Sequence, residues 1–173
     1  MGNFLSPKFG QFRDMHQVIL LTGGNLGDRL SRLSEARTLI TETIGHIDLS
    51  SGIYETAAWG NTGQPAFLNQ VLLVETSLSP EDLLKVVLSI ELAMGRVRSE
   101  KWGPREIDID ILFYGEEIIH MPHLQIPHPE IPNRRFVLEP LAEIAPALVH
   151  PVLKVNMETL LRNTSDLLEV KRL

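Results

Sequence analysis

The chain has 173 residues, which is enough for one well-packed core and too few for two ordinary domains. Its 16 lysines and arginines against 22 aspartates and glutamates leave a net charge of -6. A net-negative surface repels phosphate backbones, so we expect no general binding of nucleic acid. The sequence has no cysteine, which excludes disulfides, thiolate metal ligands and a cysteine nucleophile. It also lacks an apolar run of about 18 residues and a signal-peptide pattern, so we expect a cytoplasmic location and no membrane partner.

The beginning of the chain differs from the rest because it shows no hydrophobic periodicity. We therefore expect residues 1–14 to form a flexible tail and residues 15–173 to form a single domain. Residues 18–22 are a short apolar run that predicts a buried strand. An apolar stripe over residues 26–44 predicts the helix that follows this strand.

A glycine-rich turn joins the first strand to the first helix. Residues 23–28 read Gly-Gly-Asn-Leu-Gly-Asp, which matches neither the P-loop pattern nor the dinucleotide-binding Gly-x-Gly-x-x-Gly pattern. Asparagine and aspartate side chains both accept hydrogen bonds from the free N–H groups of a helix start. The segment therefore predicts a structural turn with Asn25 or Asp28 as the N-cap of the helix.

Two further strands are predicted over residues 47–56 and 67–76. Both are rich in aliphatic and β-branched residues, although Ser-Ser-Gly interrupts the first of them. The link between them, residues 57–66, contains two glycines and a proline and has no helical pattern. A connection this short indicates an antiparallel pair of strands.

A second helix and a fourth strand complete the pattern. Ser79 as N-cap, a proline at the first helical position and two acids in the first turn predict a helix over residues 80–94. Residues 107–114 alternate sharply. This alternation predicts the isoleucines and Phe113 on one face of the strand and both aspartates and Tyr114 on the other.

The order strand-helix-strand-strand-helix-strand is that of a ferredoxin-like βαββαβ core. This is an α+β fold in which both helices cover one face of an antiparallel sheet. Residues 115–173 form a C-terminal extension that contains many prolines. We expect the extension to wrap the core and to carry short helices over residues 136–144 and 157–161.

Asp108 and Asp110 are the first candidates for chemistry. Two residues apart on a strand, their side chains leave the same face about 6.5–7 Å apart along the backbone. Carboxylates at that spacing can share a pair of metal ions, and oxygen ligands without cysteine favour Mg²⁺. The alternative is the solvated polar face of a half-buried strand.

A cluster of basic residues precedes this strand. Arg96, Arg98, Lys101 and Arg105 lie within ten residues that contain a single acid, Glu100. Arginines at this density suit the bidentate binding of phosphate oxygens. An acid pair beside them is the combination that a magnesium-bound nucleotide requires. The alternative is that these charges neutralise one another at the surface.

Other loop and strand residues suit the same kind of ligand. Trp59 and Trp102 lie in loops that contain glycine and proline, so each is expected to contact either a ligand or another loop. Phe67 and Asn69 share a strand face, and a ring beside an amide can stack on and hydrogen-bond a planar heterocycle. His128, between two prolines, is either a phosphate or ribose contact or a structural histidine.

Several short motifs occur together in the chain. The most specific are Gly-Arg-Val-Arg at 95–98, Trp-Gly-Pro-Arg at 102–105 and Asp-Ile-Asp at 108–110. Supporting motifs are Gly-Gly-Asn at 23–25, Tyr-Glu-Thr at 54–56, Gln-Pro-Ala-Phe-Leu-Asn at 64–69, Pro-His-Pro at 127–129 and Arg-Phe at 135–136. Together they resemble the 6-hydroxymethyl-7,8-dihydropterin pyrophosphokinases, a folate-pathway family. The resemblance implies the ferredoxin-like α+β fold.

The resemblance also implies an activity. The family transfers the β,γ-pyrophosphoryl group of ATP to the pterin hydroxymethyl group, giving AMP and the pterin diphosphate, with ATP as co-substrate and two Mg²⁺ ions as cofactors. Asp108 and Asp110 are implied as metal ligands, and Arg96 and Arg105 as catalytic residues that contact the phosphates. Whether Asp108 also takes the hydroxyl proton is left open. The implied ATP-binding residues are Glu91, Arg98, Trp102, Ile111, Gln125, His128 and Arg134, and the implied pterin-binding residues are Thr56, Ala57, Trp59, Phe67, Asn69 and Phe136.

Two other functions compete with this one. The fold class also hosts RNA-binding modules, but those present aromatic and basic residues on their central strands, where this chain has two aspartates. A magnesium-dependent phosphohydrolase would use the same acid pair without an acceptor. We expect small-molecule substrates, no nucleic-acid partner and a monomer, with a dimer as the alternative.

Overall fold

The computed structural model describes residues 14–58, 63–96 and 104–173. The predicted tail, apart from its last residue, therefore lies outside the described residues. The elements in chain order are β1 (His16–Gly24), α1 (Arg29–Thr43), β2 (Gly45–Ser50), β3 (Tyr54–Thr56), β4 (Phe67–Thr76), α2 (Pro80–Ala93), β5 (Asp108–Tyr114), β6 (Ile119–Met121), β7 (Leu124–Ile126), the 3-10 helix η1 (Ile131–Asn133), α3 (Arg135–Ile144), α4 (Met157–Asn163) and β8 (Val170–Arg172).

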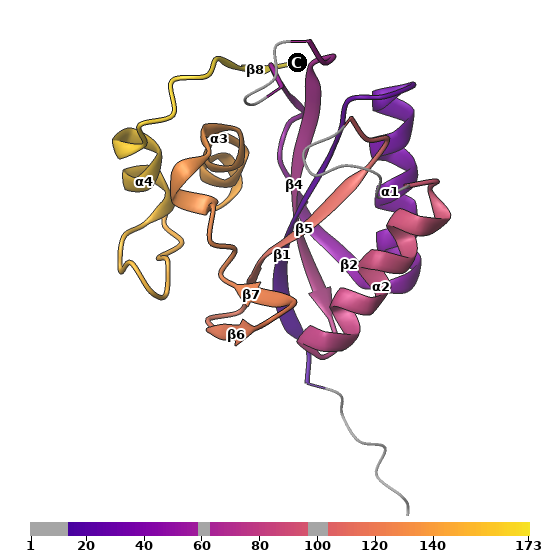
Figure 1. Ribbon diagram of the computed structural model, residues 1–173. Helices are drawn as coiled ribbons and strands as arrows, with labels where there is room; N and C mark the ends of the chain where they lie inside the picture. Colours follow the sequence, from indigo (N-terminus) through magenta and orange to yellow (C-terminus); the bar gives the residue numbers. More distant parts are fainter. Residues whose placement is uncertain (1–13, 59–62, 97–103) are drawn as a thin grey trace, which may run out of the picture.

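A six-stranded antiparallel sheet lies between two layers of helices (Figure 1). Its strand order is β5-β1-β4-β3-β8, and β2 also pairs with β4. β1 thus separates the two strands β4 and β5, which are joined through α2. This is the split strand order of the predicted ferredoxin-like core, and the predicted antiparallel pairing of the second and third strands is confirmed. A separate two-stranded sheet joins β6 to β7.

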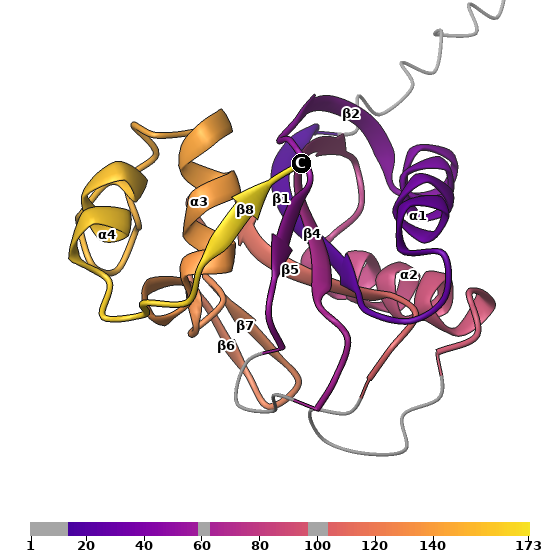
Figure 2. The same ribbon diagram turned by 90° about the horizontal axis from the view of Figure 1, so that it is seen from above.

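Helices α1 and α2 pack on the same face of the sheet, as the βαββαβ pattern predicts (Figure 2). The start of α2 forms as expected, because the Ser79 side chain accepts a hydrogen bond from Asp82 N at 3.2 Å and Pro80 occupies the first turn. Leu83 and Val87 on its inner stripe are buried in the core.

Helix α1 resolves the choice between the two predicted caps. Asp28 is the N-cap, and its Oδ1 accepts a hydrogen bond from Ser31 N at 3.1 Å. Asn25 lies before the helix and has a different role, described below. The predicted apolar stripe was placed too early, because Leu30 is exposed while Leu33 is the first fully buried residue of the helix.

The C-terminal extension covers the opposite face of the sheet. In α3, Val137 and Leu138 pack with Ile19 of β1 and Val71 of β4 in a second apolar cluster. The two predicted helices of the extension are present as α3 and α4, and β8 adds an edge strand to β3. Among the described residues, no helix is both long enough and apolar enough to cross a membrane.

The predicted strand over residues 47–56 is divided into β2 and β3. The interruption falls at Ser51, which keeps contact with β4 although it leaves the regular strand. Ser51 N donates to Val71 O at 2.9 Å, and Ser51 Oγ accepts from Val71 N at 3.0 Å. Serine and glycine have low strand propensity, and here a hydroxyl takes the place of a backbone carbonyl in the ladder.

Strand β5 departs from the predicted alternation near its end. Ile19 pairs with Phe113 and Leu20 pairs with Ile111, so Leu112 is the extra residue of a bulge. Beyond the bulge the two faces exchange, and Phe113 packs in the second apolar cluster rather than with the isoleucines. The predicted placement of Phe113 and of the residue after it is therefore wrong, because alternation from sequence assumes an unbroken ladder.

Candidate active site

The two aspartates lie at the start of β5, beside the end of β1. Asp108 is opposite Gly23 and Asp110 is opposite Leu21 in the antiparallel register. Both side chains are partly accessible, whereas Ile109 between them is buried in the core. The strand therefore presents both carboxylates on one face, as the Asp-x-Asp spacing predicts.

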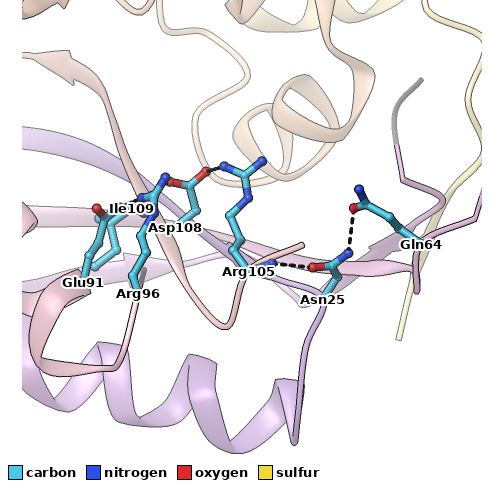
Figure 3. Close-up of polar contacts among 7 residues, drawn as sticks. All are labelled: Asn25, Gln64, Glu91, Arg96, Arg105, Asp108 and Ile109. Atoms are coloured by element: carbon cyan, nitrogen blue, oxygen red, sulfur yellow. Dashed lines mark hydrogen bonds and ion pairs between the residues drawn. The ribbon is translucent and has the colours of Figure 1, made fainter. Parts of the chain in front are cut away.

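Two arginines hold Asp108 from opposite sides. Arg96 donates hydrogen bonds to Glu91 and to Asp108 Oδ1, and Arg105 Nη1 donates to Asp108 Oδ2 at 2.7 Å (Figure 3). Glu91 is only 3% exposed, and its Oε1 also accepts a hydrogen bond from Ile109 N at 2.8 Å. The network therefore connects the end of α2 to the start of β5.

Burial and neighbouring charge shift several pKa values in this network. Burial raises the pKa of Glu91, and the nearby Asp108 adds to the effect. Burial, followed by the charge of Asp108, raises the pKa of Asp110 from 3.8 to about 7. Burial, together with the charge of Arg134, lowers the pKa of His128. Asp110, whose raised pKa disfavours its charged form, lies in this site beside several arginines. Such a site is suited to a ligand that brings both cations and anionic oxygens.

Asn25 connects the two loops that flank the aspartates. Its Oδ1 accepts a hydrogen bond from Arg105 N at 2.9 Å (Figure 3). Its own N donates to Arg105 O at 3.0 Å. Its Nδ2 donates to Gln64 Oε1 at 3.2 Å and to Pro65 O at 3.1 Å. Asn25 is 2% exposed, so one buried amide fixes the ends of both loops.

Two cavities meet at the aspartates. Their volumes are about 370 and 360 Å³. Arg96, Asp108, Asp110 and His128 line both of them. We call the first the aromatic cavity, because two phenylalanines line it, and the second the hairpin cavity, because it lies between α2 and the β6–β7 hairpin. Predicted residues in the aromatic cavity are Thr56, Ala57, Phe67, Asn69, Arg105, Arg134 and Phe136, and predicted residues in the hairpin cavity are Glu91, Ile111 and Gln125.

The aromatic cavity has a ring on each of two separate elements. Phe67 begins β4 and Phe136 lies in the first turn of α3. The Arg105 guanidinium lies 5.7 Å from the Phe67 ring centre, and the Arg134 guanidinium lies 5.9 Å from the Phe136 ring centre. The cavity thus combines flat apolar surfaces with positive charge.

A buried amide, that of Asn69, lines the aromatic cavity. Asn69 Nδ2 donates to Thr56 Oγ1 at 3.3 Å, and both residues are almost fully buried. Gly23 faces this amide closely, since a Cβ on Gly23 would lie 2.3 Å from Asn69 Oδ1. Side-chain amide and hydroxyl groups at such a place suit a planar ligand with ring nitrogens.

His128 links the hairpin cavity to the bulge of β5. Its backbone N donates to Leu112 O at 2.9 Å, so the carbonyl freed by the bulge is satisfied. Its Nδ1 accepts a hydrogen bond from Glu130 N at 3.2 Å. This leaves Nε2 as the protonated nitrogen of a neutral imidazole, consistent with the lowered pKa.

The structure brings together the predicted site residues that it describes. Arg134, which the resemblance assigns to the nucleotide, lies beside Phe136 in the aromatic cavity. Trp59, Arg98 and Trp102 lie outside the described residues.

Some residues of the site were not found from the sequence. The sequence predicts only a turn at Asn25. Its contacts with Arg105 join positions 80 residues apart and so leave no local pattern. Leu84 and Leu88 line the hairpin cavity but look like ordinary helix residues in the sequence. Glu91, which the resemblance assigns to ATP binding, also carries a signal of its own, since it lies one turn beyond Val87 on a buried helix stripe where a charge needs a partner.

Comparison with known proteins shows the family to which this chain is related. A family model described as 7,8-dihydro-6-hydroxymethylpterin-pyrophosphokinase (HPPK) matches residues 19–146. The chain is 44% identical over 138 residues to a 2-amino-4-hydroxy-6-hydroxymethyldihydropteridine pyrophosphokinase of Aquifex aeolicus (strain VF5), covering 80% of this chain and 86% of that protein. It is 45% identical over 136 residues to the protein of the same name from Methylorubrum extorquens, covering 78% and 86%.

A solved structure shows the same fold. The crystal structure of a Plasmodium falciparum HPPK-DHPS triple mutant superposes with a TM-score of 0.73 at 18% identity, covering 88% of this chain and 44% of that one. The matched region is therefore less than half of that longer chain. The class defined by the fold and the family model is an ATP-dependent pyrophosphokinase. The chain belongs to the 7,8-dihydro-6-hydroxymethylpterin pyrophosphokinase family.

Proposed function

We propose that this chain transfers the pyrophosphoryl group of ATP to the hydroxymethyl group of 6-hydroxymethyl-7,8-dihydropterin, giving AMP and the pterin diphosphate. Its family is one of pyrophosphokinases of folate biosynthesis, which sets the class of reaction. The observation that carries the proposal for this chain is the meeting of two cavities at Asp108 and Asp110. A direct transfer between two substrates requires two sites whose reacting ends meet at one charged point.

The shape and chemistry of the cavities support the assignment of the substrates. The aromatic cavity offers Phe67 and Phe136 for stacking and the Asn69 amide for hydrogen bonding, which suits a pterin ring. The hairpin cavity combines apolar residues of α2 with Gln125 and His128, which suits a nucleoside whose phosphates extend toward the aspartates.

The acid pair fits magnesium. Among the described residues there is no group of three or more histidines, aspartates and glutamates that could form a complete cage of protein ligands. Magnesium is usually held by one or two carboxylates together with water and substrate phosphates, which Asp108 and Asp110 can supply. Two bound Mg²⁺ ions would neutralise phosphate charge and lower the pKa of the attacking hydroxyl.

The arginines are suited to the phosphates. Arg105 Nε is buried and has no hydrogen-bond partner within the described part of the chain. A buried donor of this kind is stabilised by an anionic oxygen. Arg96 lines both cavities, so it can contact the pyrophosphoryl group both on ATP and on the pterin. Together they would stabilise the charge of the transition state.

The reaction needs positioning more than covalent help from the protein. The pterin hydroxyl loses its proton to solvent, its oxygen forms a bond to the β-phosphorus, and the bond from that phosphorus to the oxygen of AMP breaks. Asp108 is held by two guanidinium groups, an arrangement that favours organising charge over accepting a proton. We therefore give Asp108 no role as a dedicated base.

We further propose that the chain acts as a monomer in the cytoplasm on these two small molecules. Both cavities and the charged residues between them are formed by one chain, so the proposed chemistry requires no residue from a partner. The net charge of -6 favours neither nucleic acid nor anionic membrane surfaces as partners.

The nucleotide product tests the proposal. The protein is incubated with MgATP, with and without the hydroxymethyl pterin, and the products are followed by phosphorus NMR. We expect AMP and pterin diphosphate in equal amounts, and only when the pterin is present. ADP as the product, or AMP formed without the pterin, would overturn the proposal. Hydrolysis of ATP without an acceptor would instead indicate a phosphohydrolase.

A further inference from the structure

We propose that Arg29 is a positioning residue for the pterin side of the site. The inference rests on the proposed function, because it concerns the geometry of the aromatic cavity. Arg29 is the first residue of α1 and directly follows the glycine-rich turn over residues 23–28. Its side chain is 31% exposed, and it does not line either cavity as the described residues form them.

Arg29 joins the two strands that carry the cavity residues. Its Nη1 donates to Glu55 Oε2 at 2.9 Å and to Ala66 O at 2.8 Å. Glu55 immediately precedes Thr56, and Ala66 immediately precedes Phe67. A single guanidinium nitrogen therefore fixes the chain next to two residues that line the aromatic cavity.

The local structure explains why this contact is needed. Thr56 and Phe67 are opposite one another at the last pair of the β3–β4 ladder. β3 has only three residues and lies between β4 and β8. Thr56 is the last residue of both ladders, and the end of a ladder opens more readily than its middle. A charge-assisted hydrogen bond from a helix on the adjacent face compensates, because it holds the side chain of one strand and the backbone beside the other.

The consequence is specific to one substrate. Phe67 supplies one of the two rings of the aromatic cavity, and Thr56 accepts the hydrogen bond that orients Asn69. In the described chain the hydrogen bonds of Arg29 go to Glu55 and Ala66, and neither of these lines the hairpin cavity. Loss of the guanidinium should therefore weaken the use of the pterin and leave the use of ATP unchanged.

Steady-state kinetics of variants test this role. Arg29→Met removes the donors and keeps most of the stem, Arg29→Lys restores a cation, and Glu55→Gln removes the charge of the acceptor. Arg37→Met is the matched control, because Arg37 lies on the same helix and contacts Ser50 and Gln70 at 3.3 and 3.5 Å. The KM for the pterin, the KM for ATP, kcat and the melting temperature are measured for each variant.

For Arg29→Met we expect the pterin KM to rise about three- to tenfold while the ATP KM changes by less than about twofold. Arg29→Lys should recover most of the loss, and Glu55→Gln should raise the pterin KM by a smaller factor. Arg37→Met should leave both KM values unchanged, even if its melting temperature falls. The selective change in one KM and its rescue by lysine are effects that a merely structural residue would not produce.

Three results would overturn the inference. If the wild type is active and both Arg29→Met and Glu55→Gln have the wild-type KM for the pterin, the positioning role is excluded. The proposed function is then left intact. Equal increases in both KM values would show a general loss of structure instead. If Arg29→Met does not fold, Glu55→Gln alone decides between these outcomes. A wild type that forms no AMP would overturn the proposed function, and this inference with it.

Discussion

Asn25 and Arg105 are joined by two hydrogen bonds, one from Arg105 N to Asn25 Oδ1 at 2.9 Å and one from Asn25 N to Arg105 O at 3.0 Å. The same Asn25 side chain donates to Gln64 and Pro65 at the end of the other loop. The position of Arg105, and with it the Asp108 contact, therefore depends on a buried residue that precedes α1. Asn25 has a structural effect on both cavities although it lines neither as the described residues form them.

Replacement of Asn25 by alanine should lower both the stability and the activity of the protein. The variant leaves Arg105 N without its acceptor, so we expect the free energy of unfolding to fall by about 1–3 kcal/mol. We expect kcat/KM to fall about 10- to 100-fold, because small displacements of catalytic groups are costly. Denaturant titration and steady-state kinetics measure the two quantities.

Asn156→Ala is the matched control for this variant. Asn156 Oδ1 caps α4 by accepting from Thr159 N at 2.9 Å. Loss of that cap should cost about 1 kcal/mol without changing kcat/KM. If Asn25→Ala lowered stability as the control does and left kcat/KM unchanged, the positioning role of Asn25 would be wrong.

Asp110 should show a characteristic dependence of stability on pH. Its pKa in the folded protein is about 7, against an ordinary value of 3.8, so the folded state holds the proton more tightly than the unfolded state. The associated stabilisation is fully present below about pH 4 and is lost as the pH rises through about 7. Asp110→Asn, which stays neutral, should therefore be more stable than the wild type at pH 8 by about 1–3 kcal/mol, and this difference should disappear near pH 4.

Thermal unfolding in the presence of a chelator measures this pH dependence. The same variant should lose more than about 100-fold in kcat, because one of the two proposed metal ligands is lost. Asp48→Asn on β2 is the control and should change neither quantity. A constant stability difference between pH 4 and pH 8 would contradict the raised pKa.

Arg96 should be required for stability as well as for activity. Its side chain is 15% exposed and that of Glu91 is 4% exposed. Arg96→Ala removes a guanidinium from two carboxylates, so we expect a loss of about 3–5 kcal/mol in unfolding free energy and a large loss of kcat. Arg162→Ala, which breaks the exposed pair with Glu158, should cost less than about 1 kcal/mol. Equal losses in the two variants, measured by urea unfolding, would argue against a buried network.

Gly24 should tolerate no side chain. A Cβ at this position would lie 2.2 Å from Glu106 O, and that backbone follows Arg105 directly. We expect Gly24→Ala to lower the unfolding free energy by about 2–3 kcal/mol and to reduce kcat by displacing Arg105. Gly27→Ala is the comparison, because Gly27 has open space but a φ of +65°, and it should cost about 1 kcal/mol with little effect on kcat. Activity of Gly24→Ala at the level of Gly27→Ala would contradict the proposed close contact.

Local patterns were sufficient for much of this protein. Ser79 and Pro80 predicted the start of α2, and the short link before β4 predicted an antiparallel pair, because capping and chain reach depend on a few adjacent residues. The Asp-x-Asp spacing likewise placed Asp108 and Asp110 on one face of a strand. The motifs from Arg96 to Asp110 led to the family that the comparisons show.

How these pieces meet depends on contacts between residues that are far apart in the chain. The order of elements, the cation-rich loop and the acid pair could all be predicted, since each is a property of neighbouring residues. The sequence shows the interruption at Ser51 but not the contacts that Ser51 keeps with the distant strand β4. It does not show the bulge at Leu112, whose carbonyl is bound by His128. Nor did it reveal the roles of Asn25 and Arg29, whose hydrogen bonds span 80 and 37 residues. A side chain that bonds to the backbone of a remote loop leaves no local pattern, and only the folded chain brings the two together.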